Sequence, residues 1–251
     1  MPNLEELALC LQVIRSNMPL IDGSALSNDL LVHMPKLNKF SFYVHTMVLT
    51  MNSNYICASH DEFKRSFVAK IFPRVDSFVE DNRHTRCVYS CVYSLPYAFD
   101  FFYIFSGSFR GGTFESVEFV FVFGERAFEH EFFASISQSF PSLRKLVVRN
   151  WRSGKMKQHS STPIAFPRLR ILDVTGSHSD YAEQFLLKSR ACVPQLAEIC
   201  INYDVLAKVT NRFTVGLDQL NYNQSTTFVM DEDEDEGRVH PQHFRMYCPL
   251  L

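Results

Sequence analysis

This sequence lacks the features that mark several common classes of protein. It has no run of about eighteen apolar residues, the minimum for a membrane-spanning helix. Its first six residues, Met-Pro-Asn-Leu-Glu-Glu, lack the basic start and apolar core of a secretory signal. The formal net charge of -2 gives no overall attraction to nucleic acid or to anionic lipid. We therefore expect a cytoplasmic or nuclear protein that does not bind membranes.

Motifs for catalysis, cofactors and metals are also missing. No G-x-S-x-G elbow occurs, and the glycines of 107–112 fit neither a dinucleotide-binding loop nor a P-loop. His84, Cys87 and Cys91 are residue types that bind zinc, but no fourth ligand or paired short spacing accompanies them. The seven cysteines are an odd number, so we expect reduced thiols. We predict that the protein is not an enzyme and has no cofactor and no metal site.

What the sequence does contain is a repeat. The pattern apolar-Pro-x-apolar-x-x-apolar-x-apolar occurs at 1–9 and returns at 34–42, 72–78, 140–148, 166–174 and 193–201. Weaker copies without proline occur at 117–122 and 217–222. In each copy the last apolar residues alternate with their neighbours, as on a short strand with one face buried. The proline, which has no donor, is expected where the chain enters the strand.

The spacing of the copies and the sequence between them suggest an architecture. Pro141, Pro167 and Pro194 are 26 and 27 residues apart, within the range of about 20–29 for leucine-rich repeats. Apolar residues at helical spacing follow at 128–140 and at 181–186, and an earlier set lies at 26–31. This predicts an α/β fold, a leucine-rich-repeat solenoid with parallel strands on the concave face and helices on the convex face.

The repeat also divides the chain into predicted regions. We expect a solenoid over 1–229, with an irregular insertion at about 44–114 that includes an extra strand near 88–95. The six acidic residues of 231–236 predict an acidic loop at 230–237, and 238–251 is expected to close the solenoid. Because the first strand signal begins at Met1, its apolar side would lack a cap, which favours further chain upstream.

Several segments resemble a known family. They are Phe128–Phe133, Ser137–Pro141, Tyr181–Leu187 and Pro241–Phe244, and they are similar to the leucine-rich-repeat half of a divergent family of F-box proteins. The resemblance covers about 88–251. It implies that the repeats choose the substrate of a cullin ubiquitin ligase, whereas the adaptor would bind an N-terminal F-box. No L-P-x-E-[IL] motif of an F-box occurs in these 251 residues.

The predicted strands identify candidate binding residues, because residues next to the inward ones face outward. We expect these residues to bind a protein partner on the concave face: Phe119, Phe121, Phe123, Lys145, Val147, Arg149, Ile171, Asp173, Thr175, Glu198, Asn202 and Asn221. Three outward phenylalanines on one strand are costly to leave in water. They either anchor a partner or lie beneath the 88–105 segment.

A second function remains open at this point. The basic stretch 144–157 contains Arg144, Lys145, Arg149, Arg152, Lys155 and Lys157 around Trp151. Cations beside an aromatic ring can hold a phosphate and a base, so this stretch could bind nucleic acid. We expect protein binding, as in the substrate-recognition part of an F-box ubiquitin ligase receptor, with nucleic-acid binding as the alternative.

Overall fold

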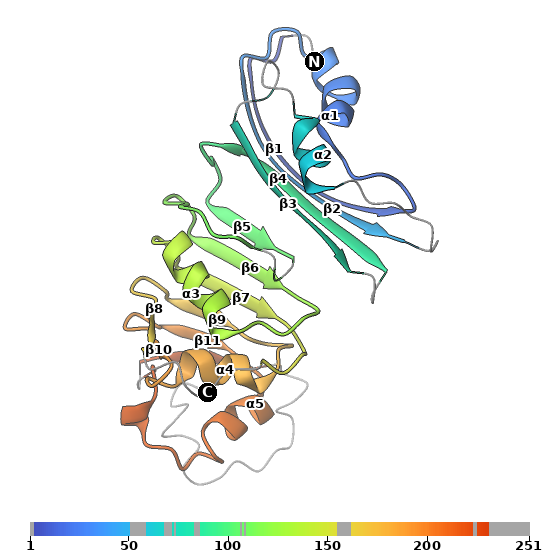
Figure 1. The fold of residues 1–251 in the computed structure, drawn as a ribbon. Coiled ribbons are helices and arrows are strands. Elements are labelled where there is room, and N and C mark those ends of the chain that lie inside the picture. The colour runs from blue at the N-terminus through green and yellow to red at the C-terminus, as the bar shows by residue number, and fades with distance from the viewer. Residues whose placement is uncertain are drawn as a thin grey trace. The chain divides into compact units, whose positions relative to one another are not determined.

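The computed structural model describes residues 3–50, 59–67, 72, 74–82, 86–105, 107, 109–154, 162–222 and 225–230. The predicted acidic loop, apart from residue 230, and the closing segment 238–251 lie outside these residues. The chain forms two compact units, Met1–Ala98 and Phe99–Leu251, each with its own sheet (Figure 1).

The first unit is a four-stranded mixed sheet with two short helices. Its elements are β1 (Glu6–Ser16), α1 (Gly23–Asp29), the 3-10 helix η1 (Leu31–His33), β2 (Lys39–Leu49), α2 (His60–Arg65), β3 (Arg74–Asn82) and β4 (Cys87–Leu95). The strand order is β1-β2-β4-β3, with β1 parallel to β2 and β4 antiparallel to both of its neighbours.

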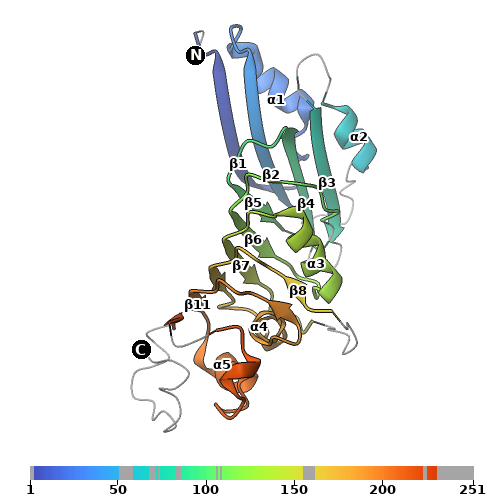
Figure 2. The ribbon, with the colours of Figure 1, turned by 90° about the vertical axis from the view of Figure 1, so that its left-hand side faces the viewer.

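Helices α1 and α2 cover one face of this sheet (Figure 2). Leu26 of α1 and Phe63 of α2 pack in one core with Phe42, Val88 and Val92 from the central strands. The outer strand β1 contributes its alternate residues, such as Leu9 and Leu11, to the same core. The residues of β1 therefore alternate between a half-buried face and an exposed face.

The second unit is built on a six-stranded parallel sheet of order β12-β11-β9-β7-β6-β5. Its strands are β5 (Phe101–Ile104), β6 (Phe119–Phe123), β7 (Lys145–Arg149), β9 (Ile171–Asp173), β11 (Glu198–Cys200) and β12 (Thr227–Val229). The remaining elements are α3 (His130–Ser139), β8 (Ile164–Ala165), α4 (Ser179–Leu186), β10 (Ala191–Cys192), α5 (Tyr203–Val209) and the 3-10 helix η2 (Leu217–Gln219).

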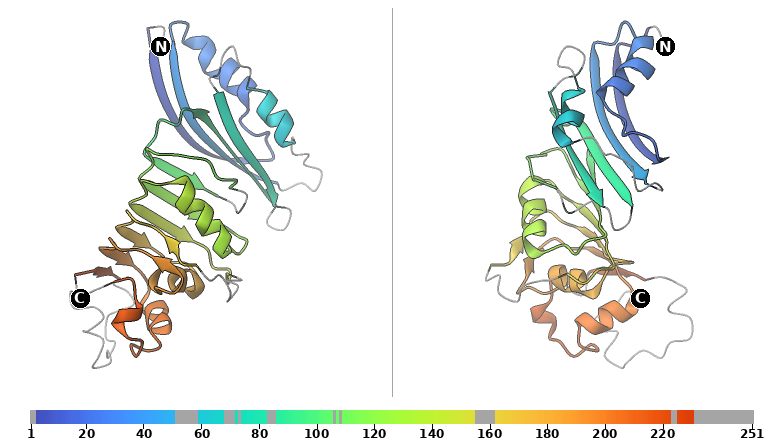
Figure 3. Two further views of the ribbon diagram at one scale, coloured as in Figure 1. Left: turned by 60° about the vertical axis from the view of Figure 1, so that its left-hand side comes forward. Right: turned by 45° about the vertical axis from the view of Figure 1, so that its right-hand side comes forward.

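Helices α3, α4 and α5 lie on one side of the parallel sheet (Figure 3). Val120, Leu146, Leu172 and Ile199 point toward this side, and all four are completely buried. They occupy the same position in successive copies of the sequence pattern and are aligned by the register of the strands. The repeated apolar position thus forms one continuous core layer beneath the helices.

The predicted leucine-rich-repeat solenoid over 1–229 is wrong. The described residues of the protein form a mixed α/β fold with three separate sheets, namely a four-stranded sheet of mixed direction, a six-stranded parallel sheet and a two-stranded parallel pair of β8 and β10. The first three copies of the pattern begin β1, β2 and β3, but β1 and β2 run for eleven residues each, far longer than the strand of a repeat. Strand β4 is antiparallel to both of its neighbours, unlike the strands of a parallel solenoid.

Candidate functional site

The outer face of the parallel sheet is the face turned away from α3, α4 and α5. Its side chains alternate along each strand with the buried core residues, as the intermediate-buried-intermediate pattern of β5, β6, β9 and β11 shows. Because the six strands are parallel and in register, these side chains form rows across the sheet. The rows change in character from aromatic on β5 and β6 to charged and polar on β7, β9 and β11.

The aromatic surface consists of six half-buried rings from two neighbouring strands and the residue after β5. The rings are those of Phe101, Tyr103, Phe105, Phe119, Phe121 and Phe123. The ring centroid of Tyr103 lies 6.0 Å from that of Phe119 and 6.0 Å from that of Phe121. Phe105 lies 6.0 Å from Phe121 and 6.5 Å from Phe123. Each ring thus supports its neighbours across the strand pair and presents an edge or face outward.

The 88–105 segment therefore does not simply cover the three phenylalanines of β6. Its last part forms β5, which pairs with β6 from Phe101–Phe119 to Ile104–Val122. Phe102 and Ile104 point into the core, so Phe101 and Tyr103 point outward beside the β6 rings. The alternation of residues through 101–105 carries this signal, which the prediction of an irregular insertion overlooks.

Trp151 extends the aromatic surface beyond the carboxyl end of β7. Its side chain is 69% exposed, the most exposed large apolar residue of the second unit's described part. Its ring meets that of Phe123 edge to face, with centroids 6.3 Å apart. An exposed tryptophan beside a layer of half-buried rings is the composition found at the centre of protein interfaces.

The charged rows are largely paired within the sheet. Lys145 lies over the Phe119 ring, with its ammonium nitrogen 5.7 Å from the centroid. Arg149 forms an ion pair with Asp173 on the next strand, with Nη2 2.7 Å from Oδ2. Burial by itself raises the pKa of Asp173, but hydrogen bonds from Arg149 and Thr175 outweigh it, and the net result is a lowered pKa.

The thiol of Cys200 lies in the same row as Asp173. Burial, followed by the nearby carboxylates of Asp173 and Glu198, raises the pKa of Cys200 to about 11. A thiol with such a pKa is almost fully protonated at neutral pH and is a poor nucleophile. Cys200 therefore contributes a small, weakly polar surface to the outer face.

The structure brings eleven of the twelve predicted binding residues together. Those on β6, β7, β9 and β11, or directly after these strands, lie on the outer face, although Val147 is only 5% exposed. Asn202 also has a local role, because its Oδ1 accepts a hydrogen bond from the Gly176 amide.

Asn221 is the exception. The weak motif at 217–222 forms the 3-10 helix η2 instead of a strand, and the sixth strand is β12, at Thr227–Val229. The Asn221 amide donates to the carbonyls of Phe185 and Ala191, and therefore fastens α4 to the start of β10. Val229, which is 45% exposed, lies on the outer row of β12 in its place.

The predicted basic stretch 144–157 does not form one basic surface in its described part, 144–154. Arg144 and Lys145 lie at the start of β7 and Arg149 at its end, about 13 Å away along an extended strand. Arg144 contacts Glu118, and Arg149 is paired with Asp173. Lys155 and Lys157 lie outside the described residues. Strand β7 therefore does not present a row of unpaired cations.

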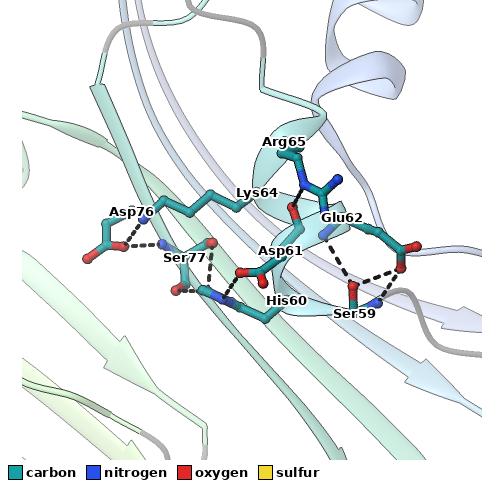
Figure 4. A network of polar contacts seen from close by, with 8 residues as sticks. All are labelled: Ser59, His60, Asp61, Glu62, Lys64, Arg65, Asp76 and Ser77. Atoms are coloured by element: carbon teal, nitrogen blue, oxygen red, sulfur yellow. Dashed lines mark hydrogen bonds and ion pairs between the residues drawn. The ribbon is translucent and has the colours of Figure 1, made fainter.

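The first unit contains one set of side chains that invites comparison with a catalytic triad. Ser77 Oγ lies 3.3 Å from His60 Nε2, and His60 Nδ1 lies 3.7 Å from Asp61 Oδ1 (Figure 4). However, His60 Nε2 is 2.8 Å from the Ser77 carbonyl oxygen, so this nitrogen must carry the proton. A nitrogen that donates to a carbonyl cannot also accept the serine proton.

The same network has a structural role. Ser59 and Glu62 form a capping box at the start of α2, and Lys64 forms an ion pair with Asp76 of β3 at 3.0 Å (Figure 4). Together with the His60–Ser77 contact, these bonds fasten α2 to β3. We assign the network to packing of the first unit.

The other residues considered for metal binding do not converge. Cys87 and Cys91 are buried on β4, and burial raises the pKa of the Cys91 thiol far above its ordinary value. His84 lies outside the described residues. Within the described ranges, no group of three or more His, Cys, Asp or Glu side chains is arranged to hold a metal ion.

Comparisons with protein-family models, with curated proteins and with solved structures found no match to this chain. Among the described residues, no helix is long and apolar enough to cross a membrane. Function must therefore be inferred from the geometry of the molecule itself.

Proposed function

We propose that this chain binds another protein through the outer face of its parallel sheet, with Trp151 and the aromatic surface as anchors. One observation carries the proposal: six half-buried rings from adjacent strands adjoin a tryptophan that is 69% exposed. Large rigid rings lose little conformational entropy on binding and bury much apolar area, which is why they dominate binding energy.

The charged rows beside the rings would supply orientation. Lys145 and Glu198 lie in one row at the amino ends of β7 and β11, on either side of Ile171, while the paired Arg149 and Asp173 lie at the carboxyl ends of β7 and β9. Charges at the rim of an interface mainly raise the association rate and select between partners. A partner would therefore bring an apolar or aromatic patch to β5 and β6, and polar groups to β7, β9 and β11.

The resemblance to F-box proteins adds a finer proposal, namely that the bound protein is a substrate of a ubiquitin ligase. This role requires an adaptor-binding segment, and no L-P-x-E-[IL] motif of an F-box occurs in these 251 residues. Sequencing of the complete transcript tests it: an F-box encoded in frame upstream would support the role, and a complete open reading frame without one would contradict it.

Protein binding can be tested by crosslinking from defined positions. A photoreactive phenylalanine analogue at Phe121 should crosslink to a partner in cell extract, whereas the same analogue at the exposed Gln138 of α3 should not. The crosslinked protein is then purified, and its affinity for the wild type is compared with that for Trp151→Ala. Because the Trp151 side chain is mostly exposed, its removal leaves the core intact. We expect at least about a tenfold loss of affinity.

Gln138→Ala is the matched control and should bind as the wild type does. A partner crosslinked equally from both positions, or an affinity that Trp151→Ala leaves unchanged, would place the binding surface elsewhere.

A further inference from the structure

The amino ends of the parallel strands hold three arginines that line one hollow. Arg144, Arg168, Arg170 and Gln195 surround a volume of about 220 Å³. The hollow lies at the opposite ends of β7 and β9 from Trp151, because Arg144 and Arg170 directly precede these strands. It therefore does not belong to the aromatic surface.

The repeat explains why these arginines meet. The same turn precedes β7, β9 and β11, closed by hydrogen bonds from the amides of Leu143, Leu169 and Leu196 to the carbonyls three residues earlier. Parallel pairing stacks the turns, so Ser142, Arg168 and Gln195 occupy equivalent positions. Arg144 and Arg170 are equivalent too, and the Arg170 amide donates to the Arg144 carbonyl at 2.8 Å.

The charge in this hollow is not balanced. Arg144 Nε lies 3.4 Å from Glu118 Oε1, in an ion pair whose side chains are both more than half exposed. Such exposed pairs are weak. Arg168 contacts only the Ser142 hydroxyl, at 3.4 Å, and neither Arg168 nor Arg170 has a carboxylate partner among the described residues. Two positive charges remain, those of Arg168 and Arg170 at the entry to β9, and like charges repel each other.

We infer that this hollow binds one phosphate-type dianion, carried by a phosphorylated serine or threonine side chain of a protein. Planar guanidinium groups donate paired hydrogen bonds that match phosphate oxygens, and a dianion neutralises the two unpaired charges. Gln195 adds an amide donor at the same hollow. The inference rests on the proposed function only for the identity of the carrier.

Three observations favour a single phosphorylated side chain over nucleic acid. The hollow is small, at about 220 Å³, which suits one phosphate and its carrier residue. Among the described residues, its lining includes no aromatic ring on which a base could stack. The whole chain also carries a net charge of -2, which disfavours a polyanion.

The test uses the full chain and two probes, inorganic phosphate and a blocked Gly-phosphoserine-Gly peptide, at an ionic strength of about 0.15 M. Calorimetry should detect binding of both probes and none of the peptide with unmodified serine. Arg168→Gln/Arg170→Gln should weaken phosphopeptide binding by at least about tenfold, since both unpaired guanidinium groups are lost. Arg168→Lys/Arg170→Lys keeps the charge without the fork and should give an intermediate affinity.

Arg126→Gln/Lys188→Gln is the charge-matched control, because both side chains are exposed on the same unit and lie away from the hollow. It should bind like the wild type. Equal losses in both double variants, or no binding of phosphate and phosphopeptide, would overturn the inference. Tighter binding of single-stranded RNA, lost with the Arg168→Gln/Arg170→Gln variant and falling with salt by about -0.7 per phosphate in log-log slope, would overturn the choice of carrier.

Trp151→Ala separates this inference from the proposed function. That variant should bind the phosphopeptide as the wild type does, since Trp151 does not line the hollow. If the wild type binds phosphate and Trp151→Ala still binds the protein partner normally, the proposal for the aromatic surface fails and the anion site is retained. If Trp151→Ala loses the partner and the wild type binds no phosphate, the anion site fails and the aromatic surface is retained.

Discussion

Arg149 and Asp173 form a two-pronged ion pair across β7 and β9, with Nη1 2.9 Å from Oδ1 and Nη2 2.7 Å from Oδ2. Asp173 Oδ1 also accepts hydrogen bonds from the backbone amide and the hydroxyl of Thr175. Both charged side chains are more than seven-tenths buried. The pair therefore fixes the outer face at the carboxyl ends of β7 and β9, and it removes Arg149 from the cations available to a polyanion.

Replacement of Asp173 by asparagine should destabilise the second unit. The asparagine side chain has only one acceptor oxygen and could not satisfy Arg149 on two sides, so we expect the free energy of unfolding to fall by about 1–2 kcal/mol. Glu118→Gln, which breaks the exposed pair with Arg144, should cost less than about 0.5 kcal/mol. Urea unfolding followed by the fluorescence of the single tryptophan, Trp151, measures both changes.

The Asp173 contribution should also depend on pH in a defined direction. The folded-state pKa of Asp173 lies below the ordinary value of 3.8. Its stabilisation is therefore complete above pH 3.8 and is lost as the pH falls through the folded-state pKa. The wild type and Asp173→Asn should converge in this acid range. A stability difference that is unchanged there would show that the pair contributes through packing and not through charge.

His45 should give the first unit a different pH dependence. Its side chain is 4% exposed in β2, and burial lowers the pKa of the imidazole from 6.5 to about 4. Between these values the unfolded chain binds a proton that the folded chain does not. The free energy of unfolding should thus fall as the pH drops from 6.5 to about 4, by about 3 kcal/mol in total.

His45→Gln should remove this component, whereas His33→Gln, at an exposed position, should keep it. Denaturant unfolding of the three proteins across this pH range, followed by circular dichroism, makes the comparison. The carboxylates are common to all three and cancel in the differences. If the His45→Gln curve stays parallel to that of the wild type, His45 is not held neutral by burial.

The sequence predicted single strands better than it predicted their arrangement. The pattern at 117–122 locates β6, and those at 140–148, 166–174 and 193–201 locate β7, β9 and β11, because each motif records local alternation between core and surface. Direction and partner are not local. Nothing in the motif at 34–42 shows that β2 continues to Leu49, or that β4 pairs between β2 and β3.

The candidate site shows the same division. The outward positions of β6 and β7 followed from alternation alone, but the neighbours that complete the surface did not. Tyr103 reaches Phe121 because β5 pairs with β6 in a particular register. Arg168 and Arg170 are 24 and 26 residues from Arg144 in the sequence, and only the stacking of the turns brings the three arginines together.

Asn221, one of the predicted binding residues, lies in the hydrogen bonds between α4 and β10, and this structural role can be tested directly. Its Nδ2 donates to the Phe185 carbonyl at 2.7 Å and to the Ala191 carbonyl at 2.8 Å, and its Oδ1 accepts from the Val193 amide at 3.5 Å. These bonds join the segment after η2 to the end of α4 and to β10. A side chain with this role should matter for folding and not for contact with a partner.

Asn221→Asp should be the most damaging isosteric change, because a carboxylate has no proton to donate and would face two carbonyl oxygens. We expect the free energy of unfolding to fall by about 2–4 kcal/mol, since two partly buried carbonyl acceptors lose their donor. Asn221→Ala should cost less, because it removes the donors without adding a charge. Gln138→Ala, an exposed amide on α3, should be nearly neutral. Urea unfolding monitored by Trp151 fluorescence gives all three values. If Asn221→Asp is as stable as the wild type, Asn221 has no structural role, and it can again be considered a residue that binds a partner.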